Sequence, residues 1–176
     1  MFPILVTNRL LLNQLEDTDA ENVLFLRSNE EVIRYIKREP DQNIQQAYDY
    51  IRLTRDRYEN KSAINWAIRK KENPELIGGI CQWNICADRK TAEIGYDLKP
   101  YYHGKGIMSE ALVAVIEFGF STLGLDKIEA FTSRYNEASK NLLLKHNFIL
   151  NPERTDEDNL DNLIFELRNP IPQLAD

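Results

Sequence analysis

The chain has 176 residues, of which 43% are hydrophobic and 28% charged, and its formal net charge at pH 7 is −6. This composition is typical of a folded chain with a hydrophobic core, and it excludes a disordered, a fibrous and a disulfide-stapled protein. Because the charge balance is acidic, nothing in it attracts nucleic acid, and we expect no nucleic-acid partner.

The N-terminal segment lacks the basic start and the long apolar run of an export signal. No stretch approaches the roughly 20 apolar residues that a membrane span requires. Cys81 and Cys86 are five residues apart, and histidine occurs only at positions 103 and 146, so we expect neither a disulfide nor a metal site. The sequence thus predicts a reduced, cytoplasmic chain with no membrane partner.

The first part of the chain predicts one strand followed by helices. Residues 9–15 are mostly apolar and are expected to form a strand. Thr18 and Glu21 fit a capping box, in which each side chain accepts a hydrogen bond from the other residue's backbone, so a short helix is expected after Thr18. A second short helix is expected over 30–36, and helical spacing of apolar residues over 44–58 predicts a longer surface helix.

From residue 63 the pattern changes to that of strands. Three strands separated by turn-like segments predict an antiparallel meander. A strongly amphipathic helix, a strand, a helix opened by Asn136 and a last strand follow, and Asn147 is expected to end the second helix in the left-handed conformation. The sequence predicts one α/β (α+β) domain over 1–176, with a core of about 7–168. The expected elements of this part are strands 63–69, 76–85 and 91–98, helix 106–122, strand 127–133, helix 136–146 and strand 159–168.

The most informative segment is the loop before the amphipathic helix, which contains Gly104 and Gly106. The first backbone N–H groups of a helix have no partner inside the helix and lie at the positive end of its dipole, and glycine lets a ligand approach them closely. The loop therefore predicts a phosphate site. It is neither a P-loop, because no Ser or Thr follows Lys105, nor a dinucleotide fingerprint, because Ser109 stands in place of the third glycine.

Several further motifs accompany this loop in a fixed order. They are the opening Thr7-Asn-Arg-Leu-Leu-Leu12 followed by Glu16-Asp17, the strand Glu93-Ile-Gly-Tyr-Asp-Leu98, the loop Tyr101-Tyr-His-Gly-Lys-Gly106, and the helix ends Asn136-Glu-Ala-Ser139 and Lys145-His-Asn-Phe148.

In this order and spacing the motifs resemble the GNAT superfamily of acetyl-CoA-dependent N-acetyltransferases. The loop matches the family's Gln/Arg-x-x-Gly-x-Gly/Ala pattern at both glycines, although Tyr101 replaces the usual Gln or Arg. The family's closing Gly-Phe is similar to Asn147-Phe148, where Asn can adopt the positive φ of the glycine. The opening motif is similar to the ribosomal-protein-alanine N-acetyltransferase branch.

The resemblance implies a mixed, mostly antiparallel and twisted sheet flanked by helices, with two central strands splayed to admit acetyl-CoA. It implies that the diphosphate lies on the backbone N–H groups of about residues 103–108. The pantetheine arm would run beside the strand at 96–98, where the N–H near Leu98 would stabilise charge on the thioester oxygen. The implied cofactor-binding residues are Tyr96, Asp97, Leu98, His103, Gly104, Lys105, Gly106, Ile107, Met108, Asn136 and Asn141.

The catalytic groups that the resemblance implies are a base and a group beside the leaving sulfur. Glu93 is the first choice for a general base, acting through a water, and Asp97 is the second; Glu93 could equally be the cross-strand partner of a Lys or Arg. The tyrosine that many family members place seven residues after the helix-opening Asn is Leu143 here. Ser139 could serve the sulfur instead, or only cap its helix.

The implied activity is transfer of an acetyl group from acetyl-CoA to a primary amine, with the N-terminal α-amine of a protein as one acceptor. Two alternatives stay open: acetylation of a small amine such as an antibiotic, polyamine or amino acid, and a non-catalytic acetyl-CoA sensor. The implied partners are acetyl-CoA and an amine acceptor. No metal is implied. The sequence identifies neither the acceptor nor the oligomeric state, and a homodimer is one open alternative.

Overall fold

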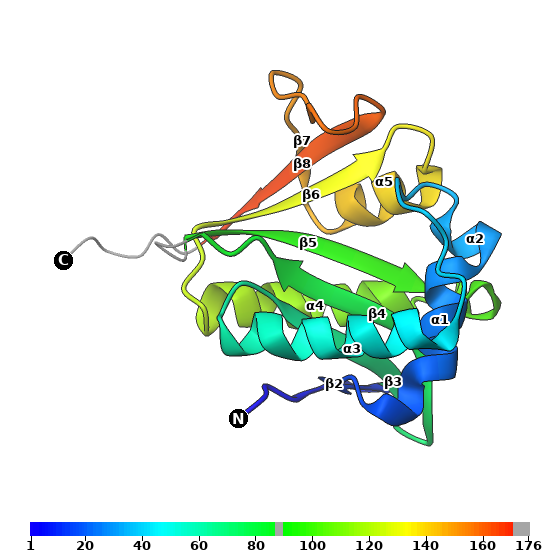
Figure 1. Ribbon diagram of the computed structural model, residues 1–176. Helices are drawn as coiled ribbons and strands as arrows, with labels where there is room; N and C mark the ends of the chain where they lie inside the picture. Colours follow the sequence, from blue (N-terminus) through cyan, green and yellow to red (C-terminus); the bar gives the residue numbers. More distant parts are fainter. Residues whose placement is uncertain (87–89, 171–176) are drawn as a thin grey trace.

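In the computed structural model, which describes residues 1–86 and 90–170, eight strands form one sheet in the order β1-β2-β3-β4-β5-β6-β8-β7 (Figure 1). Every neighbouring pair is antiparallel except β5 and β6, which are parallel. In chain order the elements are β1 (Leu5–Val6), β2 (Leu10–Gln14), the 3₁₀ turn η1 (Asp17–Asp19), α1 (Ala20–Ser28), α2 (Glu30–Ile33), α3 (Ile44–Glu59), β3 (Ile64–Lys70), β4 (Asn73–Trp83), β5 (Thr91–Leu98), the 3₁₀ turn η2 (Pro100–Tyr102), α4 (Ile107–Ser121), β6 (Lys127–Ser133), α5 (Glu137–Lys145), β7 (Ile149–Leu150) and β8 (Asn162–Arg168).

The sheet opens between its two parallel strands. β5 and β6 pair only over three positions, from Thr91 with Lys127 to Glu93 with Glu129. Beyond Glu93 the strands diverge, and Figure 1 shows the widening gap between them. The mixed, mostly antiparallel sheet with splayed central strands is therefore confirmed.

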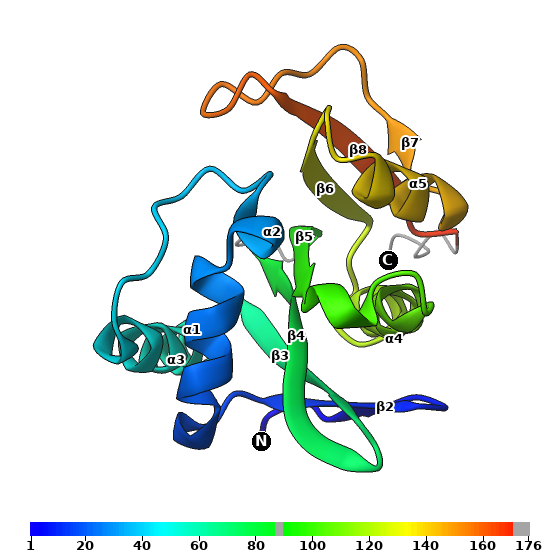
Figure 2. The ribbon, with the colours of Figure 1, turned by 90° about the vertical axis from the view of Figure 1, so that its right-hand side faces the viewer.

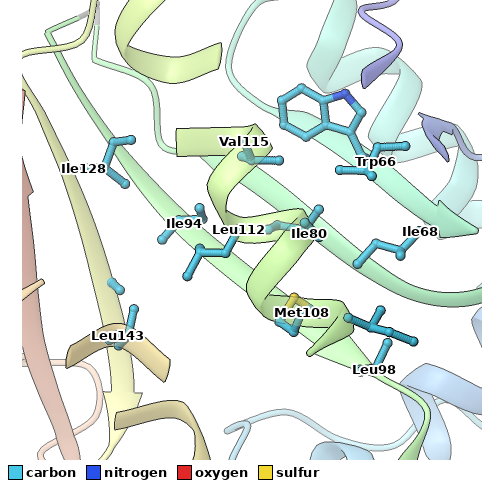
Figure 3. Close-up of a cluster of buried hydrophobic side chains, with 14 of the residues drawn as sticks. Trp66, Ile68, Ile80, Ile94, Leu98, Met108, Leu112, Val115, Ile128 and Leu143 are labelled. Atoms are coloured by element: carbon cyan, nitrogen blue, oxygen red, sulfur yellow. The ribbon is translucent and has the colours of Figure 1, made fainter. Parts of the chain in front are cut away.

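Helices cover both faces of the sheet (Figure 2). α1 and α3 pack on one face, against β4 and β3, whereas α4 packs on the other face and α5 packs on β6. Figure 3 shows the core that α4 forms, in which Met108, Leu112 and Val115 lie over Ile80 and Ile94 of the sheet. Because these α4 residues recur at helical spacing, the expected amphipathic helix is confirmed.

The antiparallel meander of β3, β4 and β5 is also confirmed. Lys127–Ser133 is a strand as expected, and Asn147 has a φ of 64° after α5. The last strand begins at Asn162, later than expected. The short strands β1 and β7, of two residues each, were not expected, because two residues carry no periodicity.

The expected capping box at Thr18 and Glu21 is wrong. The box is formed by Glu16 and Asp19, around the turn η1, and α1 begins only at Ala20. The reason is a contact across the fold: Arg69 of β3 donates to both carboxylate oxygens of Asp19, at 2.8 and 2.7 Å, and both side chains are buried. This ion pair fixes where the chain turns into α1.

Candidate active site

The loop before α4 has the conformation that its glycines allow. Gly104 and Gly106 have φ of 70° and 71°, in the left-handed region that glycine adopts without strain. A side-chain carbon built on Gly104 would meet no other atom within 4 Å, so the outer side of the loop is open. The first bond of the helix is donated by the N–H of Glu110 to the carbonyl of Gly106, at 3.1 Å.

The backbone N–H groups of residues 104–109 have no hydrogen-bond acceptor among residues 1–86 and 90–170. They form a run of donors at the positive end of α4, as a bound diphosphate would need. His103 differs from expectation, because its N–H donates to the carbonyl of Pro100 at 3.0 Å. The run of free donors therefore begins at Gly104, not at His103.

The side chains of this segment are used within the protein. The His103 ring lies 3.0 Å from the carbonyl oxygen of Leu98, and the Lys105 ammonium donates to the carbonyl of Tyr101 at 2.6 Å. Ile107 and Met108 bury their side chains in the core. A ligand at the loop can therefore contact Ile107 and Met108 only through their backbone.

The loop is held from the N-terminal end of the chain. Arg9 donates from Nε to Glu110 Oε2 at 2.6 Å and from Nη1 to the carbonyl of Lys105 at 3.0 Å. The hydroxyl of Thr7 donates to Glu110 Oε1 at 2.6 Å. Charge-assisted bonds of this kind are short and directional, so they fix the loop relative to β2. The pairing of Arg9 with Glu110 was not expected, because no sequence pattern relates residues that are 101 positions apart.

A cavity of about 340 Å³ lies where β5 and β6 diverge; we call it the β5–β6 cavity. Inside it the hydroxyl groups of Tyr96 and Ser139 lie 2.8 Å apart, and the Asn136 side chain accepts a bond from the N–H of Ser139 at 3.1 Å. Asn136 thus caps α5, as expected. Burial raises the pKa of Tyr96 to about 12, against the lowering effect of its bond to Ser139. The phenol is therefore protonated at neutral pH and can donate a hydrogen bond.

Leu98 occupies the end of β5 beside this cavity. The N–H of Lys99 donates to the carbonyl of Ile77 on β4 at 2.9 Å. Since successive residues of a strand turn their backbone groups to opposite edges, the N–H of Leu98 is directed away from β4, to the edge that β6 leaves unpaired. The side chain of Leu98 is buried.

A second cavity, of about 350 Å³, lies on the other side of β5 beneath α1 and α3; we call it the α1–α3 cavity. Asp97 lines it and accepts a bond from the N–H of Gly79 at 2.9 Å. Burial raises the pKa of Asp97 to about 6, although Arg38 and Gly79 lower it in part. The two cavities share Ile36, Gly95 and Tyr96, so they approach each other across β5.

Glu93 lies at the last position where β5 pairs with β6, outside the lining of both cavities. Among the described residues, its side-chain bond is with the amide of Asn84, at 2.7 Å, rather than with a Lys or Arg. Burial raises the pKa of Glu93, and the bond from Asn84 acts in the opposite direction. Asn141 is exposed on α5, and it also lies outside both cavities.

In residues 1–86 and 90–170, no three His, Cys, Asp or Glu side chains gather as a metal ion would require. None of the helices that these residues form is long and apolar enough to cross a membrane.

Known proteins resemble the chain in sequence and in fold. Residues 9–149 match the family model of the acetyltransferase (GNAT) domain. The uncharacterized N-acetyltransferase YoaA of Bacillus subtilis (strain 168) is 42% identical over 148 residues, which make up 84% of each of the two chains.

Two solved structures have the same fold. The ribosomal-protein-S5-alanine acetyltransferase from Vibrio fischeri has a TM-score of 0.80 at 19% identity, over 96% of this chain and 97% of the other. The microcin C7 self-immunity acetyltransferase MccE, solved in complex with acetyl-CoA and AMP, has a TM-score of 0.79 at 22% identity, over 92% of this chain and 93% of the other. At these identities the likeness shows the fold alone.

Proposed function

The chain belongs to the acetyltransferase (GNAT) family, and on that premise we propose that it transfers acetyl from acetyl-CoA to a primary α-amine by direct attack of the amine on the thioester. One observation carries the proposal: the β5–β6 cavity and the α1–α3 cavity share Gly95 and Tyr96 in their linings, where β6 no longer pairs with β5. A thioester entering from one side and an amine entering from the other would meet at this point. Such alignment supplies much of the rate in a reaction between two bound substrates.

The residues of the loop fit the diphosphate of coenzyme A. Six successive N–H groups, of residues 104–109, lack an acceptor among the described residues, and the side of Gly104 that faces outward is open. When bound, acetyl-CoA supplies the activated acetyl group. We assign its diphosphate to these donors, and we assign stabilisation of charge on the thioester oxygen to the N–H of Leu98.

For the base we favour Asp97 over Glu93. Asp97 lines the α1–α3 cavity, whereas Glu93 lines neither cavity and is bonded to Asn84. With a pKa of about 6, Asp97 is ionised at neutral pH yet basic enough to take a proton. An α-amine has a pKa of about 8, and the amine of a lysine or a polyamine has one of about 10.4. The difference between the pKa of the acceptor and that of Asp97 is smaller for an α-amine, which favours an α-amine as the acceptor.

On the other side of β5, the hydroxyl pair of Tyr96 and Ser139 is our candidate for the group that stabilises the leaving thiolate. A phenol with a pKa of about 12 is a weak acid, so we assign it hydrogen-bond donation to the sulfur rather than complete proton transfer. For the phenol proton to face the sulfur, Ser139 must donate its own hydroxyl proton to the phenol oxygen, and this bond orients the phenol. Tyr96 in this way replaces the tyrosine that is absent at Leu143.

The proposal is tested by incubating the purified protein with acetyl-CoA and a panel of amines, while a thiol reagent measures release of coenzyme A and mass spectrometry identifies the acetylated product. We expect peptides and amino acids with free α-amines to be acetylated. If none of the amines in the panel causes release of coenzyme A, transfer is refuted. Tight binding of acetyl-CoA without release would favour the sensor.

A further inference from the structure

The α1–α3 cavity is rich in cationic side chains. Among the described residues that line it are three guanidinium groups, those of Arg27, Arg38 and Arg57, and one carboxylate, that of Asp97. The whole chain, in contrast, has a formal net charge of −6. A cationic cavity in an acidic protein selects for the charge of what enters it.

Not all of these guanidinium groups are equally available. Arg27 forms an ion pair with Asp41, at 2.6 Å between Nε and Oδ2, and its guanidinium lies 4.0 Å from the centre of the Tyr50 ring. Its charge is therefore balanced within the protein. The side chain of Arg57 has neither an ion pair nor a hydrogen bond with residues 1–86 and 90–170.

Arg38 is only partly bonded within the protein. Its Nη2 has a long bond of 3.4 Å to the carbonyl of Leu26, and its Nε is buried without an acceptor in the described part of the chain. A buried cationic donor without a partner costs free energy, which an anionic ligand would offset. Arg38 and Arg57 are thus two cationic groups without an ion-pair partner within 4 Å among the described residues, and Arg38 has one buried donor left unused.

The same cavity holds two acceptors for an amine. One is the carboxylate of Asp97. The other is Asn65, whose side chain is nine-tenths buried and whose Oδ1 has no donor among the described residues. An ammonium or amine N–H would satisfy both oxygens. The cavity therefore offers acceptors to an amine and cationic groups to an anion.

Both kinds of group line one cavity. Asp97 pairs with Gly79, and Gly95 pairs with Cys81, and all four of these strand residues line the α1–α3 cavity. Arg38 and Arg57 line the same cavity. A molecule that carries both an amine and an anion could therefore present both groups inside this one space.

We infer that the acceptor is an amine that also carries a carboxylate or phosphate, held by Arg38 and Arg57 while Asp97 and Asn65 receive the amine. The inference rests on the proposed function and names its acceptor class. It disfavours polyamines, because a second ammonium would face guanidinium groups. A free amino acid and a peptide with an acidic residue next to its N-terminus share the required chemistry.

The test uses acceptors that differ in charge, and three of them, the dipeptides, differ little in shape. The dipeptide amides Ser-Glu, Ser-Gln and Ser-Lys represent a peptide N-terminus, free glutamate represents an amino acid, and spermidine represents a polycation. We expect kcat/KM to be at least tenfold higher for Ser-Glu than for Ser-Lys, and spermidine to be the poorest acceptor. Comparison of glutamate with Ser-Glu distinguishes the two sources of the anion.

The variants Arg38→Gln and Arg57→Gln should each reduce the preference for Ser-Glu over Ser-Lys at least fivefold, with KM for acetyl-CoA unchanged. Arg52→Gln is the matched control, because Arg52 lies on α3 like Arg57 but is exposed and paired with Asp49. It should leave the preference as it is. Equal use of Ser-Glu and Ser-Lys, or a preference that survives in both cavity variants, would overturn the inference.

A binding measurement separates this inference from the proposed function. Calorimetric titration of the acceptors into protein saturated with coenzyme A requires no turnover. Tighter binding of Ser-Glu than of Ser-Lys, lost in Arg38→Gln, supports the inference even if no amine is acetylated, whereas equal binding refutes it. Failure of every amine to release coenzyme A refutes the proposed transfer alone.

Discussion

The hydroxyl groups of Tyr96 and Ser139 lie 2.8 Å apart, although 43 residues separate them in the sequence. Tyr96 comes from β5 and Ser139 from α5, on opposite sides of the point where the sheet opens. Both line the β5–β6 cavity. The pair therefore exists only because the two halves of the sheet diverge and leave room for it.

If this pair stabilises the leaving thiolate, Tyr96→Phe should lower kcat by about tenfold to a hundredfold, as loss of one well-placed donor does. KM for acetyl-CoA should change little. Ser139→Ala should have a smaller effect, and the double variant should resemble Tyr96→Phe, because both changes remove one interaction. Steady-state thiol release measures all three, and additive losses would show that the two hydroxyls act independently. Tyr135→Phe, at an exposed position, is the control.

Replacing Gly104 by Val should raise the Kd for coenzyme A at least tenfold. The β-branched side chain disfavours the positive φ of the loop, at a cost of about 1–2 kcal/mol, and it fills the open outer side. Gly124→Val imposes a similar strain, since Gly124 has a φ of 67° at the far end of α4. Calorimetry should find coenzyme A affinity unchanged in that control. Equal loss of affinity in both variants would mean that the effect is one of stability only.

The pH dependence of kcat/KM tests Asp97 as the base. Its pKa of about 6 predicts that activity rises with pH through pH 6, as the carboxyl loses its proton, in addition to any rise from the amine itself. Asp97→Asn should remove the step near pH 6 and lower activity strongly, whereas Glu93→Gln should retain the step. A step that disappears in Glu93→Gln and persists in Asp97→Asn would assign the base to Glu93 instead.

Asp97 should also affect stability, with a definite sign. Its pKa is higher in the folded protein than the ordinary 3.8, so the folded state binds the proton more tightly than the unfolded state. The free energy of unfolding should therefore fall as pH rises from about 4 to about 6. The stability lost over this range is not regained at neutral pH. Asp97→Asn should weaken this pH dependence. Thermal melts of both proteins between pH 4 and 8 provide the measurement.

Arg9 is predicted to position the loop without touching the reacting atoms. Its side chain is 45% exposed, so the ion pair with Glu110 should contribute at most about 1 kcal/mol to stability. Arg9→Ala should nevertheless raise KM for acetyl-CoA severalfold with little change in kcat, because Lys105 loses its support. Arg9→Lys should restore KM only in part, since lysine cannot reproduce both bonds. An unchanged KM would contradict this role.

The buried pair of Asp19 and Arg69 should matter more to stability than any exposed pair. Asp19→Ala leaves a buried guanidinium unpaired and should lower the free energy of unfolding by about 3–5 kcal/mol. Thr18→Ala should change it by less than about 0.5 kcal/mol, because Thr18 caps no helix and is exposed. Urea denaturation of the two variants tests this assignment of the helix start. A large loss of unfolding free energy in Thr18→Ala would instead support the capping box that the sequence predicted at Thr18 and Glu21.

Those parts of the structure whose cause is local could be predicted from residue type and spacing. The left-handed conformation of Gly104 and Gly106 follows from their residue type, and the buried stripe of α4 follows from the spacing of its apolar residues. The strand Thr91–Leu98 follows in the same way from the alternation of Ala92, Ile94, Tyr96 and Leu98 with polar residues and glycine. The limits of the domain stay a prediction.

Which side chains come into contact could not be predicted, because it depends on the fold as a whole. That Asp97 rather than Glu93 lines a cavity, that Arg9 holds a loop 96 residues away, and that Arg38 and Arg57 face one space all depend on how helices pack on the sheet. The wrong prediction of a capping box at Thr18 has the same origin, since the ion pair of Arg69 with Asp19 depends on the fold and not on the local sequence. Dihedral preference and hydrophobic periodicity act between near neighbours in the chain, whereas the burial of a charge depends on whatever the fold packs around it.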